Sequence, residues 1–572
     1  MHSIVNNRGP RPGASATPRF GWRRLLTALS LVLLAGCSTR HYRESADREV
    51  YSTLAGRSGQ VAGLDADFDV TAPVAPSLTA FPTNSETAPI FGPSVDLELG
   101  ARVITLEASL ELAFRHNRTH QRQKEVVYLE ALDLTLSRHR FTPIFGGGGD
   151  ARYEERVREV ESGVDELTRS RTVNGGGFLS ADYLLRTGGR LTAAFTTDFF
   201  RLIGGDSDLV TSSALGATLI QPLWRGAGYR VAMENLTQAE RNLLYQLREF
   251  TRFRQQFAVD IAGQYYGVLQ SRDRVRNAWV AYQSAGKNAE RERALFDEGK
   301  TTLTSLGQFE QSELRNEISW VDAVRDYRQN LDEFKITLGL PTQVNLVLDE
   351  TELERLQIGS LDVSRDASME IALATRLDFF NERDAVEDAA RRVEIAANGL
   401  RPNVDLILTG GLESREGSGL QLPDPDLHHW SAGLDVELPF DRKDERNSYR
   451  ASLIQLEQAR RQYSLAEDLI RLELQADWRD LDQAGQNYRI SEKSVELSER
   501  RLEEQQLLYD LGKGLARDLL DAQDDLTDAQ NGRTDALVAY TINRLQLLKD
   551  MGLLAIERDG QIAELNEEST QP

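Results

Sequence analysis

The sequence predicts an α+β membrane protein with an internal duplication, in which long coiled-coil helices alternate with the strands of a transmembrane β-barrel. Three observations carry this prediction. Two fixed offsets align the second half of the chain with the first, apolar residues in each half recur every seven positions, and between the helical stretches they recur every second position. A seven-residue step is typical of a coiled coil, and a two-residue step is typical of a strand with one apolar and one wet face.

The N-terminal residues have the pattern of an export signal. Three arginines within residues 19–24 precede the apolar run 25–34, which is too short to remain as a membrane anchor. The run ends in Leu34-Ala35-Gly36-Cys37, which resembles the lipobox of bacterial lipoproteins. That resemblance implies that Cys37 is acylated and, because Ser38 follows it, that the protein is sorted to the outer membrane. The alternative is an ordinary secretory signal with an incidental cysteine.

The composition excludes several classes of protein. The 572 residues include 67 Lys and Arg against 89 Asp and Glu, which gives a net charge of −22, and an acidic surface without clustered basic residues does not bind nucleic acid. The single cysteine excludes a disulfide framework and a thiolate-rich metal site. After the signal no run of 18 apolar residues follows, so a membrane span in the mature chain requires a closed barrel.

The chain divides into an anchor, two copies of one unit and a tail. An offset of 213 aligns Gly299-Lys300 with Gly512-Lys513, and an offset of 259 aligns Pro143 with Pro402, because the middle of copy one is longer. We expect a lipoprotein signal peptide at 1–36, an acylated tether at 37–100, copy one at 101–340, an equatorial linker at 341–368, copy two at 369–554 and a C-terminal tail at 555–572.

Each copy contains one very long helix. The seven-residue step and the lack of proline predict helices over about 229–298 and about 445–511, each roughly 100 Å long at 1.5 Å per residue. Each ends at a glycine, and second helical stretches follow at 304–338 and 515–551. The sequence therefore predicts two long αα-hairpins, and apolar seams of this length must pack side by side in a bundle or tube.

A β segment lies between the helices of each copy, at 143–222 and 402–439. In the second segment polar residues and glycine alternate with an apolar row, Trp430, Ala432, Leu434, Val436 and Leu438. The strands of one chain are too few to close a barrel, so several chains must contribute strands. We therefore expect an oligomer.

The order of these parts, with three local motifs, resembles the TolC-like outer-membrane efflux factors of the lipoprotein type. The motifs are Leu106-Glu107-Ala108 with Ala113-Phe114-Arg115-His116-Asn117, the strand exits Gln221-Pro222-Leu223 and Leu438-Pro439-Phe440, and Tyr509-Asp510-Leu511-Gly512 followed by Asp518-Leu519-Leu520-Asp521-Ala522-Gln523. The resemblance covers about residues 100–554. It implies a homotrimer with a twelve-stranded barrel in outer-membrane lipid and a twelve-helix periplasmic tunnel.

The same resemblance implies a function. The channel would conduct substrates passively from an inner-membrane transporter and a periplasmic adaptor to the outside, as part of a tripartite efflux or type I secretion system, with a gate at the helical tip. The resemblance names neither the cargo nor the class of pump.

The extra length in the middle of copy one has two interpretations. Alternating stretches at 179–186 and 190–200 are joined by Gly188-Gly189, a tight hairpin signal. They form either an added hairpin beyond the membrane or two more barrel strands per protomer. We prefer the first, because twelve helices must feed the barrel.

The resemblance also assigns the site. The two glycine turns would lie at the periplasmic tip, and Asp518 and Asp521, three apart on one helix face, match the family positions that line the closed tip. Three chains would present two rings of carboxylates, which attract cations in a narrow channel. The alternative is a pair of solvated surface carboxylates. The residues expected at the tip turns and in adaptor contact are Gly299, Lys300, Leu303, Thr304, Gly512 and Lys513.

Other motifs indicate no chemistry. Gly299-Lys300-Thr301 ends like a phosphate loop but follows a helix and lacks the first glycine. His116 and His120 could share a metal, but neighbouring arginines favour a solvated basic helix face. We find no catalytic constellation and expect no enzyme, cofactor or metal. The rival function is a lipid-anchored periplasmic coiled-coil scaffold or adaptor without a pore, which would lack the alternating β rows.

Overall fold

The computed structural model describes residues 38–61, 63–64, 68–71, 78–159, 167–202, 210–359, 363–417, 420–557 and 560–564. The chain forms two compact units, residues 1–52 and 53–572, and their boundary falls within helix α2 (Thr39–Ser58). Cys37, the expected lipidation site, lies outside the described residues. Of the helices in these ranges, none has the length and apolar character that crossing a membrane requires. All the helices and strands after α2 belong to the second unit.

Helices and strands follow the same order twice along the chain. The first series is α3 (Leu106–His116), α4 (Arg118–His139), strands, α6 (Glu234–Asp297) and α7 (Leu303–Thr337), and the second is α9 (Arg365–Thr375), α10 (Leu377–Gly399), strands, α11 (Lys443–Asp510) and α12 (Ala516–Asp550). The long helices α6 and α11 have 64 and 68 residues. These bounds confirm the two predicted hairpins to within a few residues at each end.

Short elements complete the chain between the long ones. They are the 3-10 helix η1 (Pro89–Ser94), β1 (Arg102–Ile104), α5 (Tyr229–Ala232), β6 (Leu346–Leu348), α8 (Thr351–Glu354), β9 (Leu554–Ile556) and β10 (Ile562–Glu564). Strands β1 and β6 pair in parallel, and β9 and β10 pair antiparallel. All of these short elements except α5 contribute buried or partly buried residues to a large apolar cluster, which includes Tyr265, Tyr327 and Phe334.

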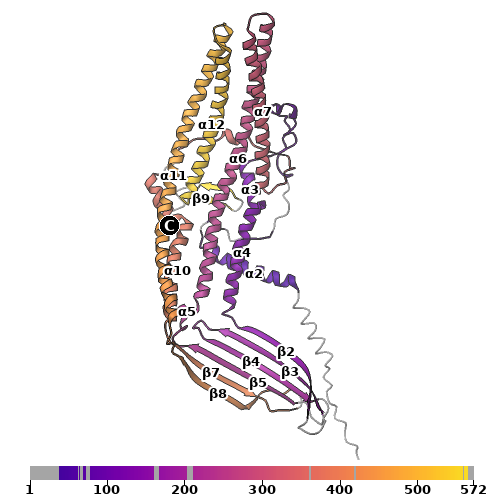
Figure 1. Cartoon of the computed structure of the whole chain (residues 1–572), viewed down its shortest axis with the longest axis vertical. Helices are drawn as coiled ribbons and strands as arrows, with labels where there is room; N and C mark the ends of the chain where they lie inside the picture. Colours follow the sequence, from indigo (N-terminus) through magenta and orange to yellow (C-terminus); the bar gives the residue numbers. More distant parts are fainter. Residues whose placement is uncertain are drawn as a thin grey trace, which may run out of the picture. The chain divides into compact units, whose positions relative to one another are not determined.

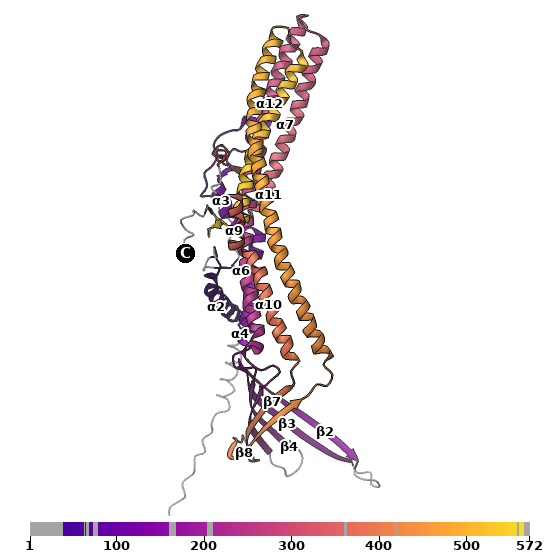
Figure 2. The same ribbon diagram turned by 90° about the vertical axis from the view of Figure 1, so that its left-hand side faces the viewer.

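The hairpin turns are made by glycine, as the sequence predicts. Gly299 and Gly512 have φ values of 68° and 67°, a left-handed conformation that glycine adopts without strain. Behind them the amides of Lys300 and Lys513 donate to the carbonyls of Leu295 and Leu508, both at 2.9 Å, which closes each helix end. Figures 1 and 2 show both turns at the end of the helices that lies away from the large sheet.

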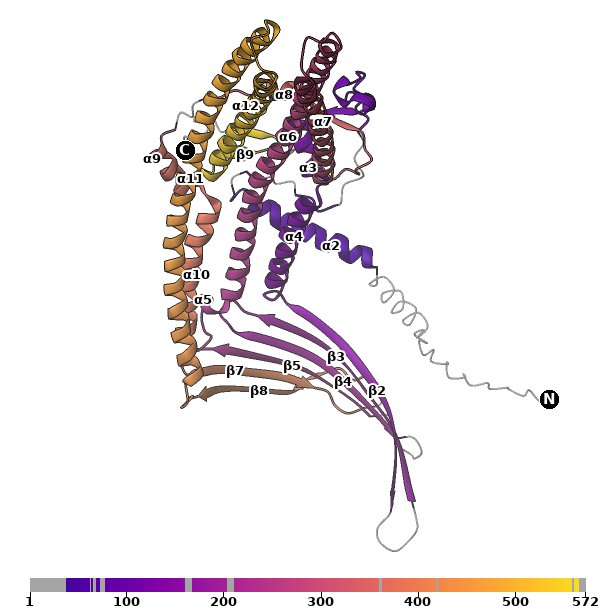
Figure 3. The ribbon, with the colours of Figure 1, turned by 45° about the horizontal axis from the view of Figure 1, so that its top comes forward.

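Six strands form one antiparallel sheet at the other end of these helices, as Figure 3 shows. The strands are β2 (Ile144–Glu159), β3 (Leu167–Leu184), β4 (Arg190–Leu202), β5 (Val210–Pro222), β7 (Asn403–Glu413) and β8 (Asp424–Glu437), in the order β2-β3-β4-β5-β7-β8. The stretches 179–186 and 190–200, which we preferred to place in a hairpin beyond the membrane, belong to this sheet. The hairpin is β3 and β4, which pair with β2 on one side and β5 on the other.

Two neighbouring rows of the sheet, on opposite faces, differ in polarity. Residues paired across antiparallel strands point to the same side, so the register groups them into rows. One row is apolar on five consecutive strands: Tyr183, Leu191, Leu219, Leu408 and Ala432. The row beside it is polar on the same five strands: Asp182, Thr192, Thr218, Thr409 and Ser431. We call these sides the apolar face and the polar face.

One sequence prediction about a helix face is wrong. His120, expected on a solvated basic face, is only 6% exposed and its ring stacks on Phe257, with centroids 5.6 Å apart. Burial is the main cause that lowers the pKa of His120 to about 3, and Lys124 and Arg254 lower it further. The ring is therefore a neutral core residue.

Candidate functional site at the hairpin tips

The tips of the two hairpins are joined by a buried carboxylate. Glu292, near the end of α6, is 1% exposed, and its Oε2 accepts a hydrogen bond of 2.6 Å from the hydroxyl of Tyr509 on α11. Its other carboxylate oxygen accepts from the hydroxyl of Thr301 in the first turn. Burial and this hydrogen bond raise the pKa of Tyr509 above its ordinary value, so the phenol remains a donor. The carboxylate thus holds both hairpins at once.

An ion pair and an apolar cluster reinforce this contact. Arg291, beside Glu292, lies 2.5 Å from Asp510, and its hydrogen bond lowers the pKa of that carboxyl. The ring of Phe309 on α7 meets the ring of Tyr509 edge to face, with centroids 5.5 Å apart. Phe309 also belongs to a buried cluster with Ala289, Ala516, Leu519 and Leu520, which draws on both hairpins. We call these contacts the tip link.

The residues expected at the turns are solvent-exposed. Leu303 is 70% exposed and Thr304, Gly512 and Lys513 are exposed as well. Lys300 forms an exposed ion pair of 2.5 Å with Glu298. On the second hairpin Leu511 and Leu515 are 60% and 67% exposed. Both turns therefore present leucine to solvent, although only the leucine of the first turn was expected to make contacts.

The two predicted gate carboxylates lie on the first turns of α12. Asp518 and Asp521 are both exposed, and Arg517 lies 3.9 Å from Asp521. The acidic face continues beyond them: Asp525 and Asp528 follow at the same seven-residue step and are also exposed. Asp525 pairs with Arg501 of α11. The sequence carried this signal, since both carboxylates are one heptad from the predicted pair.

Between these carboxylates, Asp524 has a different environment. Burial raises the pKa of Asp524, Arg315 opposes that effect, and Asp528, Asp521 and Asp525 add to it. This part of α12 therefore concentrates negative charge close to the tip, and its carboxylates repel one another.

Sequence reasoning missed the tip link. Glu292 sits among charged residues of α6, which indicates a solvated position, and its partner Tyr509 is 217 positions away. The only local signal was the Tyr509-Asp510 pair, which points to the family resemblance and not to a contact. A pairing between two helices cannot be derived from the repeat of either helix alone.

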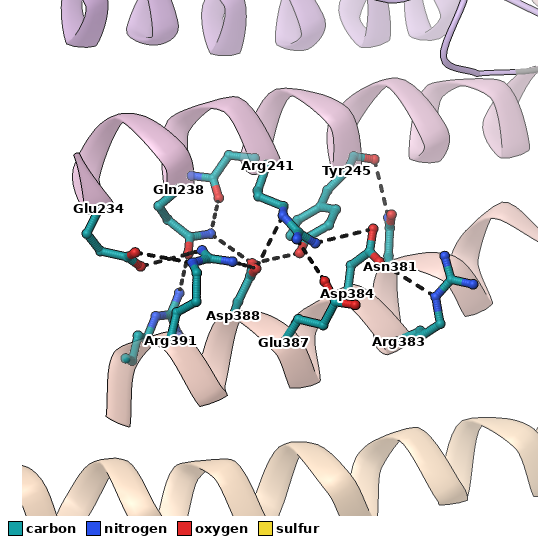
Figure 4. Close-up of polar contacts among 12 residues, drawn as sticks. Glu234, Gln238, Arg241, Tyr245, Asn381, Arg383, Asp384, Glu387, Asp388 and Arg391 are labelled. Atoms are coloured by element: carbon teal, nitrogen blue, oxygen red, sulfur yellow. Dashed lines mark hydrogen bonds and ion pairs between the residues drawn. The ribbon is translucent and has the colours of Figure 1, made fainter. Parts of the chain in front are cut away.

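A second polar contact joins α6 to α10 near the sheet, as Figure 4 shows. Asp388 on α10 is 3% exposed and accepts hydrogen bonds from Tyr245 at 2.6 Å and Gln238 at 3.2 Å. Arg391 donates to it at 2.6 Å. One turn away, the buried Asp384 accepts from Arg248 at 2.8 Å. We call this set the α6–α10 network.

The charges of the α6–α10 network are paired with one another, and the network has a structural role. Arg241 lies 2.8 Å from Glu387 and 3.6 Å from both Asp384 and Asp388. Buried carboxylates are tolerated when each has charged partners and hydrogen bonds, as here. Burial and the bond to Asp388 raise the pKa of Tyr245, so this phenol too is a fixed donor. The network therefore fastens α10, from the second series of elements, to the long helix of the first.

Comparisons with known proteins agree with this architecture. Residues 369–553 match the family model for outer membrane efflux proteins. The outer-membrane channel OprN is 14% identical, with a TM-score of 0.58, and the match covers 86% of this chain and 98% of that one. The CmeC outer membrane channel of Campylobacter jejuni is 14% identical, with a TM-score of 0.59, covering 88% and 94%.

The open state of the MtrE outer membrane channel of Neisseria gonorrhoeae is likewise 14% identical, with a TM-score of 0.56, covering 80% of this chain and 90% of that one. No curated protein matches the chain by sequence. The family model and these structures confirm the resemblance to TolC-like outer-membrane efflux factors, and the fold is that of outer-membrane efflux channels. The family that this model describes consists of channels and not enzymes, which supports the expectation that the protein is not an enzyme.

Proposed function

We propose that the chain is the outer-membrane component of a tripartite efflux or type I secretion system, which three copies form together. It passes substrates from an inner-membrane transporter and a periplasmic adaptor to the outside, without chemistry of its own, through a gate at the hairpin tips. The tip link carries the gating part of this proposal. It joins two hairpins of one chain through groups that a small displacement would separate.

Opening such a gate requires one hairpin to move against the other. The hydrogen bond from Tyr509 to Glu292 and the ion pair between Arg291 and Asp510 both cross that boundary. When the hairpins separate, water can reach the carboxylate of Glu292 and replace the hydrogen bonds that it loses. The link can therefore break and reform at a modest cost in free energy. Contact of the exposed Leu303, Thr304 and Lys513 with an adaptor would supply the energy that favours the open state.

Two further expectations belong to this proposal. Acyl chains on Cys37 would hold the N-terminus at the outer membrane, since each buried CH₂ contributes about 0.8 kcal/mol. Asp518 and Asp521 would face the axis in a trimer and form two carboxylate rings inside the closed tip. The rival scaffold without a pore has no use for a six-stranded sheet with one apolar face.

The experiment is a bilayer conductance measurement on Tyr509→Phe. We expect the variant to conduct several-fold more than the parent, because it loses the hydrogen bond to Glu292 without losing the ring contact with Phe309. Tyr245→Phe is a matched control, since it removes an equal 2.6 Å bond to a carboxylate far from the tip and should leave conductance unchanged. Equal conductance of the parent and both variants would contradict a gate at the tips. The absence of any conductance would favour the scaffold.

A further inference from the structure

We propose that β3 and β4 span the membrane as part of the channel wall, so that each copy supplies six strands and three copies close a barrel of eighteen. The inference rests on the proposed function for its trimer and its membrane. It departs from the twelve strands that the family resemblance implies. In this arrangement the acyl chains of lipid cover the apolar face, and neighbouring copies pair with the two edge strands of the sheet.

The inserted strands continue both faces of the sheet. On the apolar face Leu179 of β3 pairs with Phe195 of β4, which pairs with Leu215 of β5. On the polar face Asp182 pairs with Thr192, whose hydroxyl donates to its carboxylate at 3.0 Å. A hairpin in water on both sides has no reason to keep an apolar row in register with its neighbours. The pairing of these strands with the rest of the sheet therefore favours a common lipid-facing side.

The apolar face has the height of a membrane. On β3 it runs from Tyr183, near the helices, to Val173, which is within the roughly 9–11 residues of a membrane-spanning strand. The apolar face becomes charged from the row of Val173 outward: Arg201 of β4 pairs with Val173, and in the next row Arg171 of β3 pairs with Glu155 of β2, with 3.4 Å between their charged groups. The strands therefore extend past an apolar band of membrane thickness into a polar zone. Leu179, in the middle of that band, is 65% exposed.

Glycines within the inserted strands and beside them fit under large side chains. An added Cβ at Gly175 would lie 2.3 Å from the ring of Phe199, which covers it from the paired position on β4. Similarly, Gly147 of β2 lies under Leu179. Large side chains that cover glycine on a neighbouring strand fix the register, because a shift by one residue would create a clash.

The β3–β4 turn lies at the helix end of the sheet. At Gly188 an added Cβ would lie 2.5 Å from the carbonyl oxygen of Gly226, and the carbonyl of Thr187 accepts a 3.1 Å bond from Gly228. The turn thus packs against the loop that leads into α5. The hairpin returns across the full height of the sheet, as a wall strand must.

The outer edges of the sheet define how copies join. Strands β2 and β8, of 16 and 14 residues, each have a neighbour on one side only within the described part of the chain. Unpaired backbone groups are not tolerated in hydrocarbon, so β2 of one copy must pair with β8 of the next. Barrel diameter grows roughly in proportion to strand number, so eighteen strands enclose a lumen about half again as wide as twelve.

The test places a nitroxide at single introduced cysteines and measures collision with oxygen, which partitions into lipid, and with a water-soluble nickel complex. Leu179→Cys on the apolar face and Ser180→Cys on the polar face report on the inserted hairpin. Leu434→Cys and Asp435→Cys are the matched pair on β8. Unsubstituted protein, labelled in parallel, controls for reaction at Cys37. We expect lipid exposure at 179 and 434 and water exposure at 180 and 435.

The outcomes separate the two proposals. Lipid exposure at 434 with water exposure at 179 would overturn the wall assignment of β3 and β4 and leave the membrane channel intact. Water exposure at both would overturn the channel itself. A native mass of two copies in place of three would overturn the count of eighteen.

A deletion variant tests the width of the proposed lumen. Residues 153–209 are replaced by Asn-Gly, which joins Arg152 of β2 to Val210 of β5, the positions that share a row of the sheet through Asn174 and Phe200, and leaves four strands per copy. We expect the largest polyethylene glycol that lowers conductance from the outer side to fall by about a third in radius. An unchanged cut-off in trimeric variant protein would overturn the wider lumen.

Discussion

Asp477 on α11 has a carboxylate oxygen, Oδ2, that is buried without a hydrogen-bond partner among the described residues. Burial is the main cause that raises the pKa of Asp477 to about 7, and the nearby carboxylates of Asp550 and Glu473 raise it further, while Lys549 opposes them. Such a group is protonated in the folded state at pH values where it is ionised in the unfolded chain.

This predicts a pH dependence. Because the folded pKa lies above the unfolded value near 3.9, the stabilising contribution of Asp477 is complete below about pH 4 and is lost as the pH rises through 7. Asp477→Asn should therefore melt at a higher temperature than the parent at pH 8, and the difference should close toward pH 5. Thermal melting of the purified protein across this range measures the difference.

Asp482→Asn, which replaces an exposed carboxylate on the same helix, is the control and should show no such trend. A difference between Asp477→Asn and the parent that stays constant from pH 5 to pH 8 would contradict the assignment.

At the scale of single residues, burial is what the sequence could not supply. His120 lies among Arg118, Arg122 and Lys124, so its local surroundings indicate a solvated face, yet its ring packs on Phe114 and on aromatic residues of α6 that are 130 or more positions away. Glu292 at the tip is a second example, because it too has charged neighbours in the sequence and is buried. A charged or polar residue between charged neighbours is normally exposed, and only the tertiary partner reveals the exception.

Among the elements, the α6–α10 network predicts a measurable contribution to stability. Asp388→Ala removes the buried acceptor shared by the half-buried donors Tyr245, Gln238 and Arg391, and the loss of these hydrogen bonds costs about 1–3 kcal/mol. We expect a clear drop in the melting midpoint of the purified protein. Asp322→Ala is the control, because Asp322 and its partner Arg325 are 54% and 66% exposed and such pairs contribute little. Equal melting of the two variants would contradict a structural role for the network.

The helices were easier to predict than the sheet, for a physical reason. The ends of α6 and α11 are determined locally, by Gly299 and Gly512 in the left-handed conformation, so the sequence locates them to within a few residues. A strand's alternation also shows which side is apolar, but not which strand lies beside it. The stretches 179–186 and 190–200 indicate a hairpin, and pairing of Leu191 with Leu219 is what places them inside the sheet.

For the whole assembly, the carboxylate rings give the sharpest prediction. Asp518→Asn combined with Asp521→Asn removes two charges per copy at the proposed tip, so block of conductance by divalent cations in bilayers should weaken by at least several-fold. Asp322→Asn, an exposed carboxylate on α7, changes charge by one without touching α12 and should leave the block intact. Undiminished cation block in the double variant would show that these carboxylates do not line the pore.

The sequence alone predicted the fold well and the order of the strands in its large sheet poorly. Repeated hairpins, the period-two segments and the Tyr509-Asp510-Leu511-Gly512 motif led to the family whose model matches residues 369–553 and to the positions of both turns. The tip link and the six-strand order depend on contacts between segments far apart in the chain, which no local period encodes.

The inserted hairpin also changes the symmetry of the proposed trimer. Each copy contributes one helical hairpin from each of its two series, so the helical part can approach sixfold symmetry around its axis. The sheet cannot, because the first series supplies β2, β3, β4 and β5 and the second only β7 and β8. The wall would therefore alternate between wide and narrow sectors, and the six helical hairpins would meet a rim of only threefold symmetry.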